Sequence, residues 1–361
     1  MPAKPPIHAV ILAGGAGERF WPASRSRRPK PFLRVVGGRT LLAATLARAR
    51  SVAGPDRVWI VCGGDHARAI RAESGLPARR VLVEPRRRNT AAAVGLAARR
   101  ISAEAPDAVL VVLPADHHIP DARAFTADVR RAARAADEAS VLVTLGVRPE
   151  RAETGYGYIQ QGAAVGRRHP RLHRVKRFVE KPDAATARRY LRRGDHLWNA
   201  GIFVWSARTI LEEIEVHEPA LHRALAPLDG IGRRLPRAVL ERVYRRAPSV
   251  PIDVAVLERS RRVWTLPVRW HWSDVGTWES LASELGVRPG RSRVLGGSVI
   301  RDDAGGNLVW GRPERPIALL GVEGLAVVDT GDALLVTRLD RSAEVRELVS
   351  ALKRRGRSDV T

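Results

Sequence analysis

Five almost uninterrupted apolar runs alternate with amphipathic segments through the first 150 residues, and this alternation limits the folds open to the chain. The runs cover residues 7–13, 58–62, 81–84, 109–113 and 141–147. The segments between them, at 41–52, 66–73, 90–101 and 124–139, have helical spacing of their apolar residues. Strands without polar alternation need helices on both faces, so the pattern predicts an α/β fold with a mainly parallel sheet.

The rest of the sequence divides into a mixed part and a β-type tail. Strands at 158–160, 175–180, 202–205 and 263–272, with helices at 184–192 and 210–216, predict a continuation of the same sheet with an inserted subdomain. After Gly286, short β runs at 298–300, 308–310, 317–320, 325–328 and 334–337 are broken by glycines and precede an amphipathic helix over 342–354. We therefore predict two domains, residues 1–286 and a small C-terminal β domain over 287–361.

Composition excludes several classes of protein. The chain is 45% hydrophobic, so it can bury a large core, but no run has the length of a transmembrane helix. We expect no signal peptide, because the residues before the first strand contain no apolar h-region. The single cysteine, Cys62, lies in an apolar run and predicts a small buried residue of a cytoplasmic protein. The net charge is +24, yet the arginines are spread over helix faces without a clustered stripe, so we expect neither a nucleic-acid nor a membrane partner.

The first apolar run leads into a glycine-rich stretch. The run ends at Ala13. The glycines and cations that follow it are Gly14, Gly15, Gly17, Arg19 and Lys30. Glycines let backbone N–H groups approach an anion closely, and the two cations add full charges. The spacing fits neither the P-loop nor the dinucleotide fingerprint. A plain turn after an edge strand is the alternative, but the two cations favour a triphosphate site.

Two aspartates follow apolar segments at predicted strand ends. Asp116 lies in LPADH and Asp274 in WSDVGTW. Mg²⁺ prefers one or two carboxylates together with phosphate oxygens and water, so the pair predicts a magnesium site. Asp116 could instead cap a turn or a helix, and Asp274 could cap the helix that begins near Thr277.

Three further motifs predict a sugar-binding region. Gly157 lies in the glycine-aromatic segment ETGYGYI, Glu180 and Lys181 are adjacent in FVEKP, and Asn199 lies in LWNAG. The glycine suits close backbone approach to a sugar ring, Glu180 and Asn199 suit hydroxyl binding, and Lys181 suits a contact with the sugar's phosphate. The alternative for Glu180 and Lys181 is an exposed ion pair that contributes little to stability.

One resemblance to a metal site is rejected. His217 and His222 mimic a zinc-protease motif, but they are five residues apart and Pro219 interrupts the helix between them.

Only five lysines occur among 62 basic residues, so 57 are arginines. Where arginine is so prevalent, a lysine within a motif predicts a position that needs a compact ammonium. Lys30 and Lys181 are such positions, and we expect lysine-to-arginine exchange there to cost far more activity than at Lys353.

Together the motifs LAGGAGERFWPASR with PKPFL, EPRRRNTAAA, LPADH, ETGYGYI, FVEKP, LWNAGIFVW, IDVAVLE and WSDVGTW resemble, in this order, the sugar-1-phosphate nucleotidyltransferases, and within them the mannose-1-phosphate guanylyltransferases. The resemblance runs from Ala9 to about Trp278. It implies a Rossmann-like nucleotidyltransferase core and a β-helix-like C-terminal domain. It also implies transfer of GMP from GTP to α-D-mannose 1-phosphate, with release of pyrophosphate.

The resemblance implies roles for individual residues. The residues implied to bind the nucleotide are Ala13, Gly14, Gly15, Gly17, Asn89 and Thr90. Those implied to act in catalysis are Arg19, Lys30 and Lys181, and those implied to bind the sugar phosphate are Gly157, Glu180 and Asn199. Asp116 and Asp274 are implied to bind Mg²⁺. Pro31 departs from the pattern, because related enzymes usually have glutamine after the motif lysine. The chain also has no room for the isomerase domain of longer relatives, which predicts a single activity.

Three other functions are left open. A sister enzyme would use glucose or heptose phosphate or another nucleotide, and a regulatory protein would keep the scaffold without the chemistry. A nucleic-acid binder would use the basic surface. A homodimer is an open option.

Overall fold

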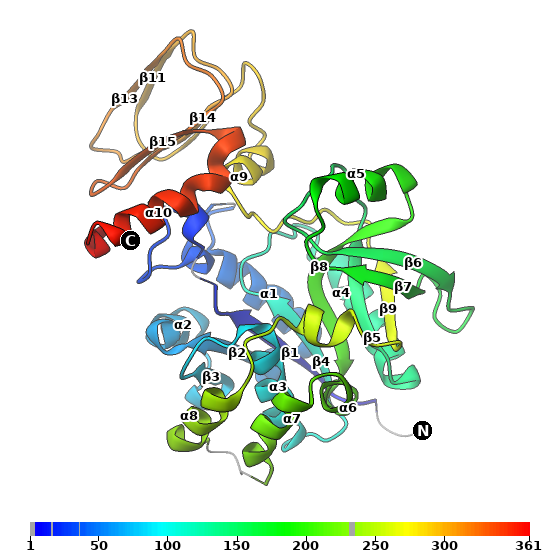
Figure 1. Ribbon diagram of the computed structural model, residues 1–361. Helices are drawn as coiled ribbons and strands as arrows, with labels where there is room; N and C mark the ends of the chain where they lie inside the picture. The colour runs from blue at the N-terminus through cyan, green and yellow to red at the C-terminus, as the bar shows by residue number, and fades with distance from the viewer. Residues whose placement is uncertain (1–3, 16, 36, 231–234) are drawn as a thin grey trace. The chain divides into compact units, whose positions relative to one another are not determined.

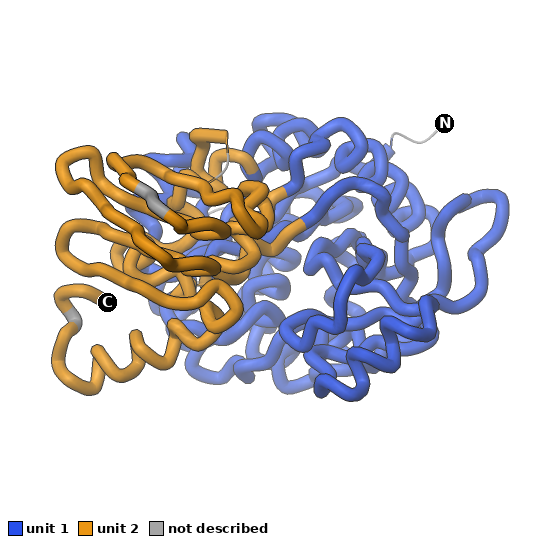
Figure 2. Tube along the Cα trace, turned by 90° about the horizontal axis from the view of Figure 1, so that it is seen from above, with its two compact units in different colours: residues 1–14, 45–115, 119–272 blue, residues 15–44, 116–118, 273–361 orange. Residues whose placement is uncertain are grey.

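The computed structural model describes residues 4–15, 17–35, 37–230 and 235–361, apart from the side chains of Arg301, Asp302 and Ser358. The chain forms two compact units, and neither is contiguous in sequence. The first contains residues 1–14, 45–115 and 119–272, and the second contains 15–44, 116–118 and 273–361 (Figure 2). The predicted boundary between residues 286 and 287 stays a prediction, because compactness groups separate segments and does not test it.

The first unit is built on a nine-stranded sheet in the order β3-β2-β1-β4-β8-β5-β9-β7-β6 (Figure 1). Its strands are β1 (Ile7–Ala13), β2 (Val58–Gly63), β3 (Val81–Glu84), β4 (Val109–Pro114), β5 (Leu142–Val147), β6 (Tyr158–Ala164), β7 (His173–Val179), β8 (His196–Ser206) and β9 (Val263–Pro267). Strands β1 to β4 pair in parallel, as the apolar runs predict. The middle strands join the same sheet, and β8 runs antiparallel between β4 and β5.

The helices of this unit are α1 (Leu41–Ala53, of which residues 45–53 belong here), α2 (Ala67–Ser74), α3 (Asn89–Ser102), α4 (Ala122–Ala139), α5 (Ala184–Arg193), α6 (Ala207–His217), α7 (Pro219–Leu225) and α8 (Arg237–Arg246). Helices α3, α6, α7 and α8 contribute to one buried cluster with residues of the sheet. Helix α6 ends before Pro219, which begins α7, so the two histidines of the rejected zinc motif lie on separate helices.

Two predictions for this unit are corrected. The strand predicted over 263–272 ends at Pro267, because only residues 263–267 pair with β5. Residues 253–257, for which no element was predicted, form a π-helix, η7 (Asp253–Leu257), a rare element that often occurs at functional sites. Cys62 is buried, as expected, and burial raises the pKa of its thiol to about 12.

The second unit combines the glycine-rich stretch with the C-terminal residues. It contains short 3₁₀ turns η1 (Glu18–Phe20) and η2 (Lys30–Phe32), helices α9 (Trp278–Glu284) and α10 (Val345–Arg354), and the turn η8 (Leu339–Glu344). Six short strands are β10 (Arg293–Leu295), β11 (Val299–Asp302), β12 (Leu308–Trp310), β13 (Ile317–Leu320), β14 (Leu325–Asp329) and β15 (Leu334–Arg338). They form a four-stranded and a two-stranded sheet with mostly parallel pairs.

Among the described residues, no helix combines the length and the apolar character that crossing a membrane requires.

Candidate active site

Gly17 shapes the glycine-rich turn and brings it against Lys30. Its φ of 66° lies in the left-handed region, and a Cβ there would stand 2.3 Å from the Cβ of Lys30. Ser24 holds the same turn by donating its hydroxyl to the Gly17 carbonyl at 2.5 Å. Gly15 is exposed, and a Cβ there would meet no atom within 4 Å. One glycine is therefore required by close packing, while the other leaves open space for a ligand.

Lys30 joins the two predicted metal-binding segments. Its side chain is only 8% exposed. The ammonium donates to Asp116 Oδ2 at 2.8 Å and to the backbone carbonyl of Asp274 at 2.6 Å. The structure thus brings together residues that are 86 and 244 positions apart. Pro31 occupies an early position of the η2 turn, where a missing N–H is tolerated.

Neither aspartate serves as a helix cap. Asp121 caps α4, and Thr277 caps α9 in a capping box with Ser280. Asp274 Oδ1 instead accepts from the Gly276 N–H at 3.1 Å, and a Cβ at Gly276 would lie 2.6 Å from Oδ2. The structure therefore decides against the helix-capping alternative for both carboxylates.

The ionisation of Asp116 suits cation binding. Burial acts to raise the pKa of this carboxyl, but the positive charge of Lys30, with a contribution from His117, outweighs it and lowers the pKa below its usual value. Asp116 is therefore a carboxylate at neutral pH.

The described residues contain no group of three or more side chains able to hold a metal. Mg²⁺ does not need one, because it takes one or two carboxylates and fills its shell with water and phosphate oxygens. Asp116, bonded to Lys30 through its carboxylate, and Asp274, bonded to Lys30 through its backbone carbonyl, supply two carboxylates and match that donor set. Arg19 lies in η1 and makes no hydrogen bond or ion pair within the described part of the chain. Its guanidinium is thus available to an anion.

The residues predicted to bind the sugar also converge, within the first unit. A Cβ at Gly157 would stand 2.5 Å from Glu180 Oε2 and 3.3 Å from Asn199 Cβ, and the Asn199 N–H donates to the Gly157 carbonyl at 2.8 Å. Lys181 has a φ of 48° and donates to Glu180 Oε1 at 2.5 Å, with 62% of its side chain exposed. The missing side chain of Gly157 therefore lets both Glu180 and Asn199 lie close to its backbone.

Asp253, at the start of the π-helix, belongs to this cluster and was missed as a site residue. Asn199 donates Nδ2 to Asp253 Oδ1 at 2.9 Å, while Asn199 Oδ1 accepts from the Thr144 hydroxyl and the Gly201 N–H. Burial, reinforced by the charge of Glu180, raises the pKa of Asp253 to about 7. The only sequence signal was its position in IDVAVLE.

The predicted nucleotide residues of the first unit are less tightly assembled. Ala13 ends β1 and is buried, while Asn89 and Thr90 begin α3. Asn89 Oδ1 accepts from the Thr90 N–H at 2.9 Å, and the Thr90 hydroxyl accepts from the Ile252 N–H at 2.8 Å. Thr90 therefore holds the segment that leads into the π-helix.

Gly14 lies beside a residue that the sequence reasoning missed. The one atom within 4 Å of a Cβ at Gly14, among the described non-neighbouring residues, is Glu84 Oε2. Glu84 ends β3, and burial raises its pKa to about 7. The signal available was the EP pair that opens EPRRRNTAAA at a strand end.

Comparison with known proteins shows the family of this chain. Residues 8–285 match the Nucleotidyl transferase family, and residues 297–352 match the MannoseP isomerase/GMP-like beta-helix domain. The chain therefore belongs to the nucleotidyl transferase family, with a β-helix-like C-terminal domain.

Named relatives cover nearly the whole chain. The xanthan biosynthesis protein XanB of Xanthomonas campestris pv. campestris (strain B100) is 40% identical over 98% of this chain and 74% of its own length. The mannose-1-phosphate guanylyltransferase RfbM of Salmonella typhimurium is 36% identical over 97% of this chain and 73% of its own length. A crystal structure from Thermus thermophilus, named mannose-1-phosphate geranyltransferase, has a TM-score of 0.87 and 38% identity, covering 96% of this chain and 99% of that one.

Proposed function

We propose that this chain transfers GMP from GTP to α-D-mannose 1-phosphate and releases pyrophosphate. The observation that carries the proposal is the buried ammonium of Lys30, packed against Gly17 and bonded to Asp116 and to the Asp274 backbone. Such a cluster suits a polyphosphate bound with a divalent cation. The mannose and guanine specificity is supported by the name of the relative RfbM.

The reaction needs positioning and charge neutralisation more than proton transfer. A phosphate oxygen of the sugar phosphate attacks the α-phosphorus of GTP in line, forming the new P–O bond as the bond to pyrophosphate breaks. The attacking oxygen is already anionic, so no general base is required. Arg19 and Lys30 supply positive charge to the triphosphate, and the exposed ammonium of Lys181 suits the phosphate of the sugar.

Asp116 and Asp274 are the residues that would hold Mg²⁺. When bound, the ion neutralises phosphate charge. The lowered pKa of Asp116 keeps this carboxyl ionised for that task at neutral pH.

The sugar-side cluster supplies complementary hydrogen-bonding groups. Asn199 uses its carbonyl oxygen and one N–H inside the protein, which leaves one amide N–H to donate to a sugar hydroxyl. Glu180 has carboxylate oxygens to accept from hydroxyl groups, and Gly157 leaves the space beside it.

A pyrophosphate-release assay that crosses GTP, ATP, UTP and dTTP with mannose and glucose 1-phosphates tests the proposal. We expect GTP with mannose 1-phosphate to give the highest kcat/KM, by at least about tenfold. A higher value for another combination would assign the chain to a sister enzyme, and no release with any combination would favour a regulatory protein. Cytoplasmic location and a homodimer stay predictions.

A further inference from the structure

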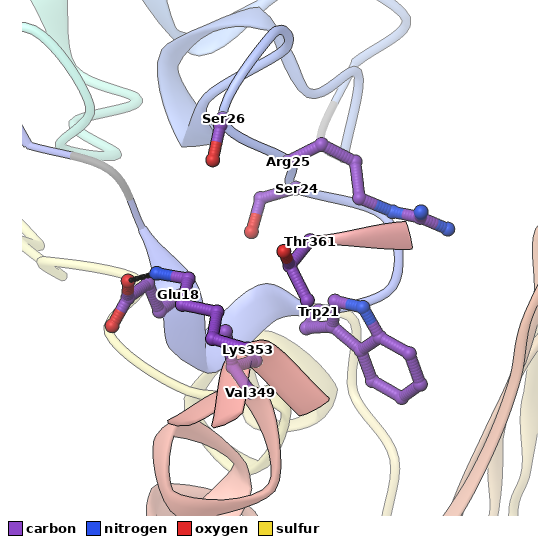
Figure 3. A pocket seen from close by; sticks show the side chains of 8 residues that line it. All are labelled: Glu18, Trp21, Ser24, Arg25, Ser26, Val349, Lys353 and Thr361. Atoms are coloured by element: carbon purple, nitrogen blue, oxygen red, sulfur yellow. Dashed lines mark hydrogen bonds and ion pairs between the residues drawn. The ribbon is translucent and has the colours of Figure 1, made fainter. Parts of the chain in front are cut away.

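The glycine-rich turn has a second neighbour, the C-terminal helix α10, which contacts it through charged and polar groups. Lys353 of α10 donates from Nζ to Glu18 Oε1 at 2.5 Å (Figure 3). The indole N–H of Trp21 donates to the carbonyl of Val360 at 2.6 Å. Glu18, Trp21 and Lys353 line one small pocket (Figure 3). Two contacts across more than 330 positions therefore join the C-terminal segment to the turn.

The same two segments share a hydrophobic core. Phe20 and Trp21 are buried in one cluster with Val345 and Val349 of α10, which are 1% and 2% exposed. The carbonyl of Trp21 also accepts from the indole N–H of Trp278 at 3.2 Å. Close-packed side chains transmit displacements, so the position of η1 depends on the C-terminal segment.

The ion pair itself contributes little to stability. The side chains of Lys353 and Glu18 are 45% and 40% exposed, and exposed pairs have small net effects because solvent screens them. Its importance lies in what surrounds Glu18. This carboxylate stands between Gly17 and Arg19, directly within the stretch that faces the triphosphate under the proposed function.

Glu18 is a disadvantage at such a place unless it is neutralised. An unpaired carboxylate there repels the polyphosphate and competes with it for the guanidinium of Arg19. In the structure Lys353 carries the opposite charge to Glu18, and Arg19 has no partner within the described residues.

We propose that Lys353, on the C-terminal helix, is a positioning residue for the glycine-rich turn: it holds and neutralises Glu18 so that Arg19 stays available to the triphosphate. The inference rests on the proposed function, since it assumes that the turn receives a nucleoside triphosphate. It gives the C-terminal segment a part in nucleotide binding as well as in folding.

The test is a charge cycle in the full-length chain. Lys353→Met is expected to raise the KM for GTP, and the Kd measured by calorimetry, roughly fivefold, with kcat and the KM for mannose 1-phosphate within about twofold of wild type. Lys353→Arg keeps the charge and is expected to behave as wild type. The double variant Glu18→Gln/Lys353→Met removes both charges and is expected to return the KM and Kd for GTP to within about twofold of wild type.

Arg341→Met is the matched control. Arg341 pairs with Glu344 at comparable exposure, 64% and 49%, and both residues belong to η8, so this pair places no counter-charge on a residue of the glycine-rich turn. We expect it to leave GTP binding unchanged. A Lys353→Met variant with wild-type GTP affinity, or a double variant as impaired as the single one, overturns the inference.

Calorimetry separates this inference from the proposed function. If wild type binds GTP without turnover on mannose 1-phosphate, the proposed function fails, yet the same charge cycle on binding still decides the role of Lys353. If wild type binds no GTP, both are overturned.

Discussion

Two clusters of predicted site residues, one in each compact unit, place their lysines in opposite environments. The side chain of Lys30 is 8% exposed and bonds to the carboxylate of Asp116 and a backbone carbonyl. The side chain of Lys181 is 62% exposed and bonds to Glu180, its neighbour in sequence. Both stood out equally in the sequence as rare lysines in motifs. The difference indicates that Lys30 is preorganised by its surroundings, whereas Lys181 can move to meet a ligand.

The largest expected effect comes from breaking this contrast with one substitution at each lysine. Lys30→Arg puts a longer, planar group into a buried position fitted to an ammonium, so we expect kcat/KM to fall by about 10³. Lys181→Arg keeps an exposed charge, and we expect a fall of about tenfold. Steady-state kinetics measures both, with Lys353→Arg as the near-neutral reference. A Lys30→Arg variant that retains a tenth of the activity would contradict the contrast.

The two aspartates of the proposed magnesium site come next. Asp116→Asn and Asp274→Asn remove a negative charge from the proposed magnesium site, and we expect each to lower kcat by about 10² and to raise the Mg²⁺ concentration at half-maximal rate. Binding of Mn²⁺ with GTP, followed by electron paramagnetic resonance, gives a readout independent of turnover. Asp121→Asn is the control, since Asp121 caps α4 and should affect stability alone. Unchanged Mn²⁺ affinity in both site variants would refute the metal assignment.

Glycine substitutions sharpen the comparison between the clusters. Gly17→Ala adds a Cβ 2.3 Å from Lys30 Cβ at a positive φ, so we expect a loss of about 2–4 kcal/mol in unfolding free energy as well as lost activity. Gly157→Ala meets the end of a side chain, Glu180 Oε2, at 2.5 Å, so we expect about a tenfold rise in KM for the sugar phosphate with a smaller loss of stability. Denaturant unfolding measures the stability loss expected for Gly17→Ala, and steady-state kinetics measures the KM change expected for Gly157→Ala. Gly15→Ala is the control for stability, because its Cβ would meet no atom within 4 Å.

The last expected effect is a pH dependence of stability that arises in the sugar-side cluster. The pKa of Asp253 is about 7 when folded, against an ordinary value of 3.8. Between these pH values the folded chain binds more protons than the unfolded chain, so the free energy of unfolding falls as the pH rises. The contribution of Asp253 to stability is therefore complete below about pH 4 and is lost as the pH rises to 7. Asp253→Asn should therefore flatten the decline of unfolding free energy between pH 4 and 7, by at most about 4 kcal/mol. An unchanged slope, with exposed Asp56→Asn as reference, would mean that Asp253 titrates normally.

Local pattern was enough for much of the fold. The apolar runs located β1 to β5, because a strand covered on both faces must be apolar throughout its length. The local pattern could not predict that β8 inserts antiparallel between β4 and β5, because the direction and neighbours of a strand depend on contacts between residues distant in sequence. The π-helix at residues 253–257 was missed for a related reason: its hydrogen-bond pattern has no compositional signal.

The predicted site residues show the same division. Motif order was sufficient to select Gly157, Glu180 and Asn199, and the structure brings these three together. Asp253 and Glu84 were missed, because a carboxylate becomes distinctive only through its burial, which raises the pKa of each to about 7.

By itself, the sequence determined where glycines, cations and carboxylates follow strands, because strand periodicity and glycine freedom are properties of neighbouring residues. Only the tertiary structure decided the partners. It paired Lys30 with Asp116 and the Asp274 backbone, Asn199 with Asp253, and Lys353 with Glu18, across separations of 54 to 335 positions. The physical reason is that hydrogen bonds and ion pairs act over a few ångströms, so they depend on which distant segments the packed core brings into contact.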